Sequence, residues 1–131
     1  MSARRKRILV LDASEFVLMN LERVLENSEF DTTTTWDMQE ALRLLGERRF
    51  DLLLVGEHPP EVDAAEMLRQ LQYNRLSAPA IILLPEVYPF APEYFYSLGA
   101  AEVISKWHYG ELAQHLQQRW AAPARAAAAG R

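Results

Sequence analysis

Short apolar segments alternate with amphipathic segments along most of this chain. The apolar segments favour buried strands, since a strand covered on both faces reads as a continuous hydrophobic run. We expect five strands, at residues 8–11, 30–35, 52–55, 80–84 and 101–105. The second contains four consecutive threonines and is the least apolar, so it is predicted to lie nearer an edge of the sheet.

The segments between and after these strands carry apolar residues at helical spacing. Residues suited to capping a helix precede three of them: Ser14, Asp37 and Asp63. Glutamates three residues after the two aspartates favour capping boxes, and glycines at 46 and 99 are expected to end the second and fourth helices. The alternation predicts an α/β fold, with a parallel sheet covered on both faces through right-handed crossovers.

The chain has 131 residues, of which 50% are hydrophobic and 24% charged, as expected for one globular domain. It divides into a basic N-terminal tail (1–6), a folded body (7–120) and an alanine-rich tail or linker stub (121–131). No apolar run approaches the roughly 20 residues of a membrane span, and the start does not read as a signal peptide. We therefore expect a cytoplasmic protein with no membrane partner. The lack of cysteine excludes disulfides and thiolate metal sites.

The formal net charge of −4 hides an uneven distribution. All 18 acidic residues lie within residues 8–120, whereas both ends of the chain are basic. An acidic body argues against a nucleic-acid partner, which would need clustered cations along the phosphates. It is compatible with a cation site, a solvated surface or a basic partner, and the charge alone does not choose among these.

Several motifs, in order and at matching spacing, resemble the receiver domains of two-component response regulators. They are Arg7-Ile-Leu-Val-Leu-Asp12, Glu40-Ala-Leu42, Phe50-Asp-Leu-Leu-Leu-Val55, Pro60, Asp63, Pro79-Ala-Ile-Ile-Leu-Leu84, and Gly99-Ala100 ahead of Lys106. The resemblance implies a flavodoxin-like (βα)5 doubly wound parallel sheet of order 2-1-3-4-5. Any site would lie at the carboxyl ends of the strands.

The resemblance also implies a phosphorylation pocket, from which this chain departs. Receivers use two adjacent acids to hold Mg²⁺, an aspartate as phosphoacceptor, a threonine or serine, and a lysine. The corresponding positions here are Asp12, Ala13, Gly56, Leu84 and Lys106. Only the first acid and the lysine are kept. We therefore expect no Mg²⁺ or other cofactor, no enzymatic activity and no phosphorylation.

Two further positions that receivers use to transmit phosphorylation are also changed. The family's switch aromatic is replaced by Val103, and the proline after the lysine by Trp107. The chain is thus identified as a degenerate receiver, or pseudo-receiver, in the phosphorelay family. We expect Asp12, with Glu57 as a second candidate, to pair with Lys106 in place of metal and phosphate.

Aromatic residues gather in the last third of the chain. Those expected to be at least partly exposed, and so to form a partner surface, are Tyr88, Phe90, Tyr96, Trp107 and Tyr109. By resemblance, the face of helix 4, strand 5 and helix 5 would bind a protein partner or a second copy. Core packing is the alternative interpretation. Two other functions stay open: small-molecule sensing in the space left by Ala13 and Gly56, and residual phosphotransfer on another carboxylate.

Overall fold

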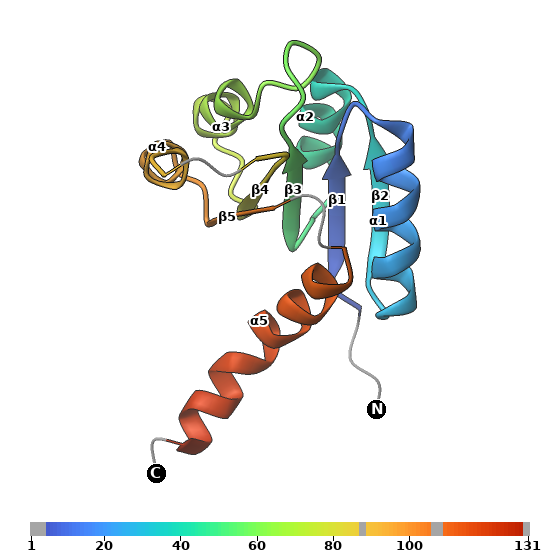
Figure 1. Ribbon diagram of the computed structural model, residues 1–131, viewed down its shortest axis with the longest axis vertical. Helices are drawn as coiled ribbons and strands as arrows, with labels where there is room; N and C mark the ends of the chain where they lie inside the picture. Colours follow the sequence, from blue (N-terminus) through green and yellow to red (C-terminus); the bar gives the residue numbers. More distant parts are fainter. Residues whose placement is uncertain (1–4, 87–88, 106–108, 130–131) are drawn as a thin grey trace.

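A computed structural model describes residues 5–86, 89–105 and 109–129, with side chains described up to Trp120 except that of Tyr109. Strands and helices alternate throughout this part of the chain (Figure 1). The strands are β1 (Arg7–Leu11), β2 (Asp31–Thr35), β3 (Leu52–Gly56), β4 (Ala80–Leu84) and β5 (Glu102–Ser105). The helices are α1 (Glu15–Asn27), α2 (Met38–Glu47), α3 (Ala64–Tyr73), α4 (Ala91–Ser97) and α5 (Tyr109–Ala129).

The strands form one parallel sheet of order β2-β1-β3-β4-β5, which confirms the predicted flavodoxin-like fold. The threonine-rich β2 lies at an edge, as its composition indicated. Leu11 pairs with Val55, Gly56 with Leu83, and Leu84 with Ser105. These pairings bring the carboxyl ends of β1, β3, β4 and β5 together along the same end of the sheet.

Two hydrophobic cores lie on opposite faces of the sheet, because successive strand residues point to opposite sides. Leu9 and Leu11 belong to the core beneath α2, α3 and α4, whereas Ile8 and Val10 belong to the core beneath α1 and α5. Figure 1 shows α5 continuing beyond the end of the sheet. No helix in the described ranges is both long and apolar enough to cross a membrane.

The three predicted helix caps are confirmed. Ser14 Oγ accepts from the Val17 amide at 3.3 Å, and the Asp63 carboxylate accepts from the Glu66 amide at 3.0 Å. Asp37 Oδ2 accepts from the Glu40 amide at 2.9 Å.

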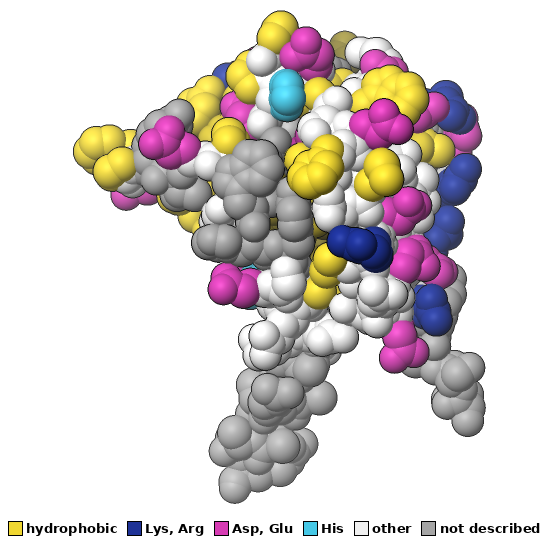
Figure 2. All heavy atoms as spheres, turned by 45° about the vertical axis from the view of Figure 1, so that its right-hand side comes forward, with side chains coloured by type: hydrophobic (Ala, Val, Ile, Leu, Met, Phe, Trp, Pro, Cys, Tyr) yellow, Lys and Arg dark blue, Asp and Glu magenta, His cyan; other side chains and the backbone are white. Residues whose placement is uncertain are grey.

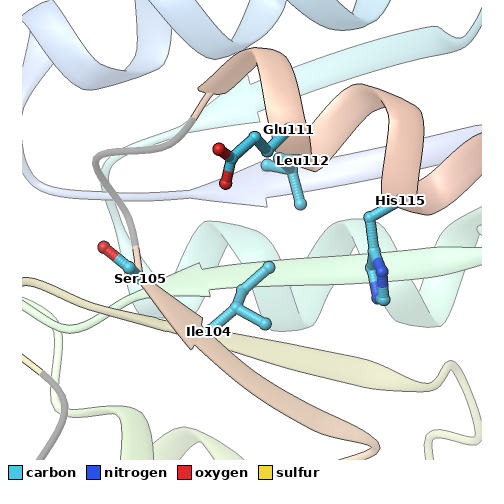
Figure 3. A pocket seen from close by; sticks show the side chains of 5 residues that line it. All are labelled: Ile104, Ser105, Glu111, Leu112 and His115. Atoms are coloured by element: carbon cyan, nitrogen blue, oxygen red, sulfur yellow. The ribbon is translucent and has the colours of Figure 1, made fainter.

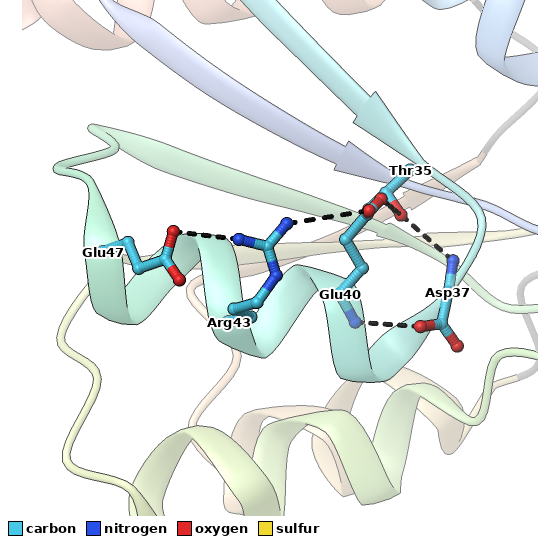
Figure 4. Close-up of polar contacts among 5 residues, drawn as sticks. All are labelled: Thr35, Asp37, Glu40, Arg43 and Glu47. Atoms are coloured by element: carbon cyan, nitrogen blue, oxygen red, sulfur yellow. Dashed lines mark hydrogen bonds and ion pairs between the residues drawn. The ribbon is translucent and has the colours of Figure 1, made fainter.

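The expected capping box at α2 is only half formed, because the Glu40 side chain does not accept from the Asp37 amide as it would in a complete box. Glu40 accepts from the buried Thr35 hydroxyl at 2.6 Å, and the Asp37 amide donates to that same hydroxyl oxygen at 3.2 Å (Figure 4). The exposed Arg43 contacts both Glu40 and Glu47 along the helix. Thr35 thus links the end of β2 to the first turn of α2.

Some predicted boundaries need correction. Gly46 does not end α2, which continues through Glu47, whereas Gly99 follows α4 with φ of +105°, as predicted. Glu29 and Arg75 also take positive φ just after α1 and α3, where no glycine marks the turn. Tyr109, one of the aromatics expected to form a partner surface, is the first residue of α5, and the helix extends into the alanine-rich segment.

Candidate functional site

The space beside Gly56, at the end of β3, is filled by the side chain of Asp12. A β-carbon built at position 56 would lie 1.8 Å from Asp12 Oδ2 and 2.7 Å from its Cγ. Neither distance is compatible with a real contact. Asp12 can hold its present position only because residue 56 has no side chain.

Asp12 is fully buried and held at the end of β1 by its backbone and side chain. Its amide donates to the Thr35 carbonyl at 3.2 Å, and its Oδ1 accepts from the Ser14 amide at 2.8 Å. The second bond lies within the turn that leads into α1. Local structure therefore orients one carboxylate oxygen, and the other faces Gly56.

The side chains at the carboxyl ends of these strands do not fit the Mg²⁺ site of receivers. Mg²⁺ requires near-octahedral oxygen coordination, usually from one or two carboxylates together with phosphate oxygens and water. Here Ala13 supplies no ligand, and one Asp12 oxygen already accepts from Ser14. Among the described residues, no cluster of three His, Asp or Glu side chains is arranged to bind a metal.

Leu84, which the resemblance assigns to the threonine or serine position of receivers, is an apolar side chain. It is 3% exposed at the end of β4 and belongs to the core beneath α2, α3 and α4. Val103 of β5 packs against the same core. Neither side chain can donate a hydrogen bond.

The nearby acids have other structural roles. Glu57 Oε1 accepts from the Ala64 amide at 2.8 Å, which supports the first turn of α3. Asp51 Oδ2 accepts from the Arg7 amide at 2.8 Å, at the opposite end of the sheet. The predicted pairing of Asp12 or Glu57 with Lys106 stays a prediction, because Lys106 lies outside the described residues, as do Tyr88 and Trp107.

Two of the predicted surface aromatics are exposed on and beside α4. Phe90 is 79% and Tyr96 47% exposed, whereas Phe95, between them, is buried in the core. Tyr94 is also about half exposed, at 48%, and its ring contacts Phe95 edge-on. The α4 helix therefore has one buried anchor and several aromatic side chains open to solvent.

Polar contacts connect α5 to β5, the edge strand of the sheet. Glu102 accepts from Arg119 at 2.8 Å and also contacts His115. A pocket of about 370 Å³ lies between this strand and helix, lined by Ile104, Ser105, Glu111, Leu112 and His115 (Figure 3). These contacts fix α5 relative to the edge strand.

A second group of exposed hydrophobic residues, which was not predicted from the sequence, consists of Phe16, Met19 and Trp36. Their side chains are 63–68% exposed, near α1 and the end of β2. Figure 2 shows this side of the molecule, with hydrophobic and acidic side chains interspersed. A signal was available, because Phe16 and Met19 are three residues apart and lie off the buried stripe of Val17, Leu21 and Leu25.

The basic start of the chain contributes to packing. Lys6 Nζ lies 5.7 Å from the centre of the Trp120 ring, and the Arg7 guanidinium lies 5.4 Å from that of Phe50. Both are within the range of cation–π contacts. Two of the four consecutive basic residues at positions 4–7 therefore contact aromatic rings within the protein.

Similarity to solved structures agrees with the fold. The chemotaxis response regulator CheY4 of Vibrio cholerae superimposes with a TM-score of 0.79 at 20% identity, covering 88% of this chain and 98% of that one. A CheY-like receiver domain from Methanospirillum hungatei gives 0.77 at 20% identity over 88% and 93% of the two chains.

Sequence comparison finds related regulators. The alkaline phosphatase synthesis transcriptional regulatory protein PhoP of Bacillus subtilis is 31% identical over 77% of this chain and 42% of its own length. The sensory/regulatory protein RpfC of Xanthomonas campestris is 28% identical over 79% of this chain and 15% of its own length. The chain therefore spans less than half of these curated relatives.

The family model for the response regulator receiver domain matches residues 8–117, almost all of the folded body. This match agrees with the sheet order and with the sequence and structural relatives. The chain belongs to the response regulator receiver domain family, whose role is signal transduction.

Proposed function

We propose that this receiver domain transmits its signal by protein binding, without phosphorylation at the end of β3. The contact between Asp12 and Gly56 carries this proposal. The acceptor position has no side chain, and the neighbouring carboxylate fills the space that an acceptor would occupy. An apolar Leu84 and the missing second acid at Ala13 support the same conclusion.

The proposed binding surface is the face of α4, β5 and α5. Phe90 and Tyr96 provide exposed aromatic rings, the residue type most enriched at binding hot spots. The hydrogen bond between Glu102 and Arg119 joins β5 to α5 and so holds two of these three elements together. A surface held in one arrangement favours a constitutive partner, which is a second copy of the chain or another protein.

Intact-mass spectrometry tests the first half of the proposal. The protein is incubated with acetyl phosphate and Mg²⁺, beside a receiver that retains both adjacent acids and the acceptor aspartate. We expect the control receiver to gain a phosphoryl group and this chain to gain none. A phosphorylated fraction of this chain would contradict the proposal and favour transfer to another carboxylate.

Self-association measured by light scattering tests the second half. If two copies associate through this face, Tyr96→Ala and Phe90→Ala should weaken the dimer, whereas Trp36→Ala should not. Trp36 is a matched control because it is 68% exposed and follows β2, at the far edge of the sheet from β5. Greater loss with Trp36→Ala would place the interface elsewhere.

If light scattering finds only monomers at every protein concentration, a homodimer is excluded. Binding of a different protein to the same face is then tested with a photoreactive phenylalanine at position 96 or 36. The proposal requires cross-linking to another protein predominantly from position 96.

A further inference from the structure

An apolar pocket of about 520 Å³ lies beside the degenerate phosphorylation site, between the end of β4 and the start of α4. Its apolar walls include Leu84, Pro85, Phe90, Ala91, Tyr94 and Phe95. This volume is within the range of roughly 300–1,000 Å³ that is typical of small-molecule sites. It is separate from the space beside Gly56, which Asp12 fills.

The inner wall of the pocket is fixed before any ligand binds. Leu84 and Phe95 are 3% and 5% exposed and belong to the core beneath α2, α3 and α4. The Tyr94 hydroxyl accepts from Arg69 Nη2 at 3.1 Å, and this bond raises the pKa of Arg69. Tyr94 is thus held by α3 at its hydroxyl and by Phe95 at its ring.

The charges at the pocket select the type of ligand. Glu57 and Glu86 are the charged side chains among the described residues that line it, and both are acidic. The negative charge of Glu86, which is exposed, disfavours a phosphate or another anion. The faces of aromatic rings also attract cations, and Phe90, Tyr94 and Phe95 contribute three rings to the lining.

We propose that this pocket binds a small aromatic amine, with its rings against Leu84 and the α4 aromatics and its ammonium group towards Glu86. The apolar Leu84, where receivers have a hydroxyl, makes the inner wall suited to a ring. Phe90 belongs both to the pocket and to the proposed partner surface, so ligand binding and partner binding would be coupled. That coupling rests on the proposed function, whereas ligand binding does not.

Three probes that share one ring system test the proposal: tryptamine, indole and indole-3-acetate. Binding is measured on the full chain at neutral pH by titration calorimetry, in the absence of any partner. We expect tryptamine to bind more tightly than indole, because its ammonium group is attracted to the carboxylate of Glu86. Indole-3-acetate should bind at least about tenfold more weakly than tryptamine, because its own carboxylate is repelled there. Equal affinities or no binding would overturn the proposal.

Substitutions then locate the site. Glu86→Gln should weaken tryptamine binding about threefold or more and leave indole unchanged, because only the amine uses the carboxylate. Glu22→Gln removes the same charge from an exposed position on α1, across the sheet, and should change neither affinity. An equal effect of the two substitutions would contradict the assignment.

Ala91→Phe should fill the pocket and abolish binding of both tryptamine and indole. Chemical-shift mapping on the unmodified protein gives a result that does not depend on the variant folding. Tryptamine should shift resonances of Leu84, Ala91 and Tyr94. Shifts confined to α1 or α5 would place the ligand elsewhere and overturn the proposal.

Discussion

The carboxylate of Asp12 occupies the space that a side chain at position 56 would need. Asp12 directly follows β1 and Gly56 is the last residue of β3. Because β1 and β3 are neighbouring parallel strands, the sheet brings the two residues together. The absence of a side chain at position 56 and the buried position of the Asp12 carboxylate are therefore one packing arrangement.

Gly56→Ala should destabilise the fold by about 1–3 kcal/mol, the usual cost of overpacking a core. The new β-carbon would lie 1.8 Å from Asp12 Oδ2, so the buried carboxylate must move. Urea denaturation measures the change. Gly46→Ala is the matched control, because nothing lies within 4 Å of a β-carbon there, and it should stabilise α2 by up to about 1 kcal/mol.

The same substitution in an Asp12→Ala background tests the specific pair. Of the three atoms nearest to the new β-carbon, all belonging to Asp12, only its Cβ, at 3.2 Å, would remain. Most of the cost of Gly56→Ala should then disappear, with a coupling free energy of about 1 kcal/mol or more. An unchanged cost in the two backgrounds would show that the carboxylate is not the obstacle.

Gly99→Ala should cost about 1–3 kcal/mol, because its φ of +105° is unfavourable for any residue with a side chain. A β-carbon there would also lie 2.7 Å from Gln72 Nε2, which donates to the Leu98 carbonyl. Gly110→Ala provides the comparison, since no atom lies within 4 Å of its β-carbon. Similar stabilities of the two variants in urea would contradict the strain at the α4–β5 turn.

Glu102→Gln should destabilise the fold by about 1 kcal/mol at low salt, with a smaller effect as NaCl is added. Glu102 and Arg119 are only 24% and 28% exposed, so solvent screens their bond less than it screens a surface pair. Glu47→Gln removes a partner of the more exposed Arg43 and should cost less than about 0.5 kcal/mol. Urea titrations at two NaCl concentrations distinguish the pairs, and equal losses would argue against a special role for Glu102.

Trp120→Ala should cost about 2–3 kcal/mol, because the indole packs α5 against Phe30, in the segment between α1 and β2. Its ring lies 5.5 Å from that of Phe30 and beneath Lys6. Trp36→Ala, at a 68% exposed position, should change stability by no more than about 0.5 kcal/mol. A thermal or urea unfolding series that ranked these two in the reverse order would refute the packing role.

Features that depend on neighbouring residues in the chain could be predicted well. Ser14, Asp37 and Asp63 cap their helices because a short polar side chain reaches an amide three residues ahead. The prediction for Gly46 was wrong because a glycine ends a helix only where the chain turns to positive φ. The chain makes that turn at Glu29 and Arg75 after other helices, and neither residue type indicates it.

The sequence alone predicted the fold correctly, because hydrophobic periodicity and motif spacing are properties of the linear chain. It could not determine which side chain fills the space beside Gly56. That depends on side chains from separate strands meeting at one edge: Asp12 closes against Gly56, and Leu84 becomes the wall of a separate apolar pocket. Close packing couples such residues through volume, which no pattern along the sequence records.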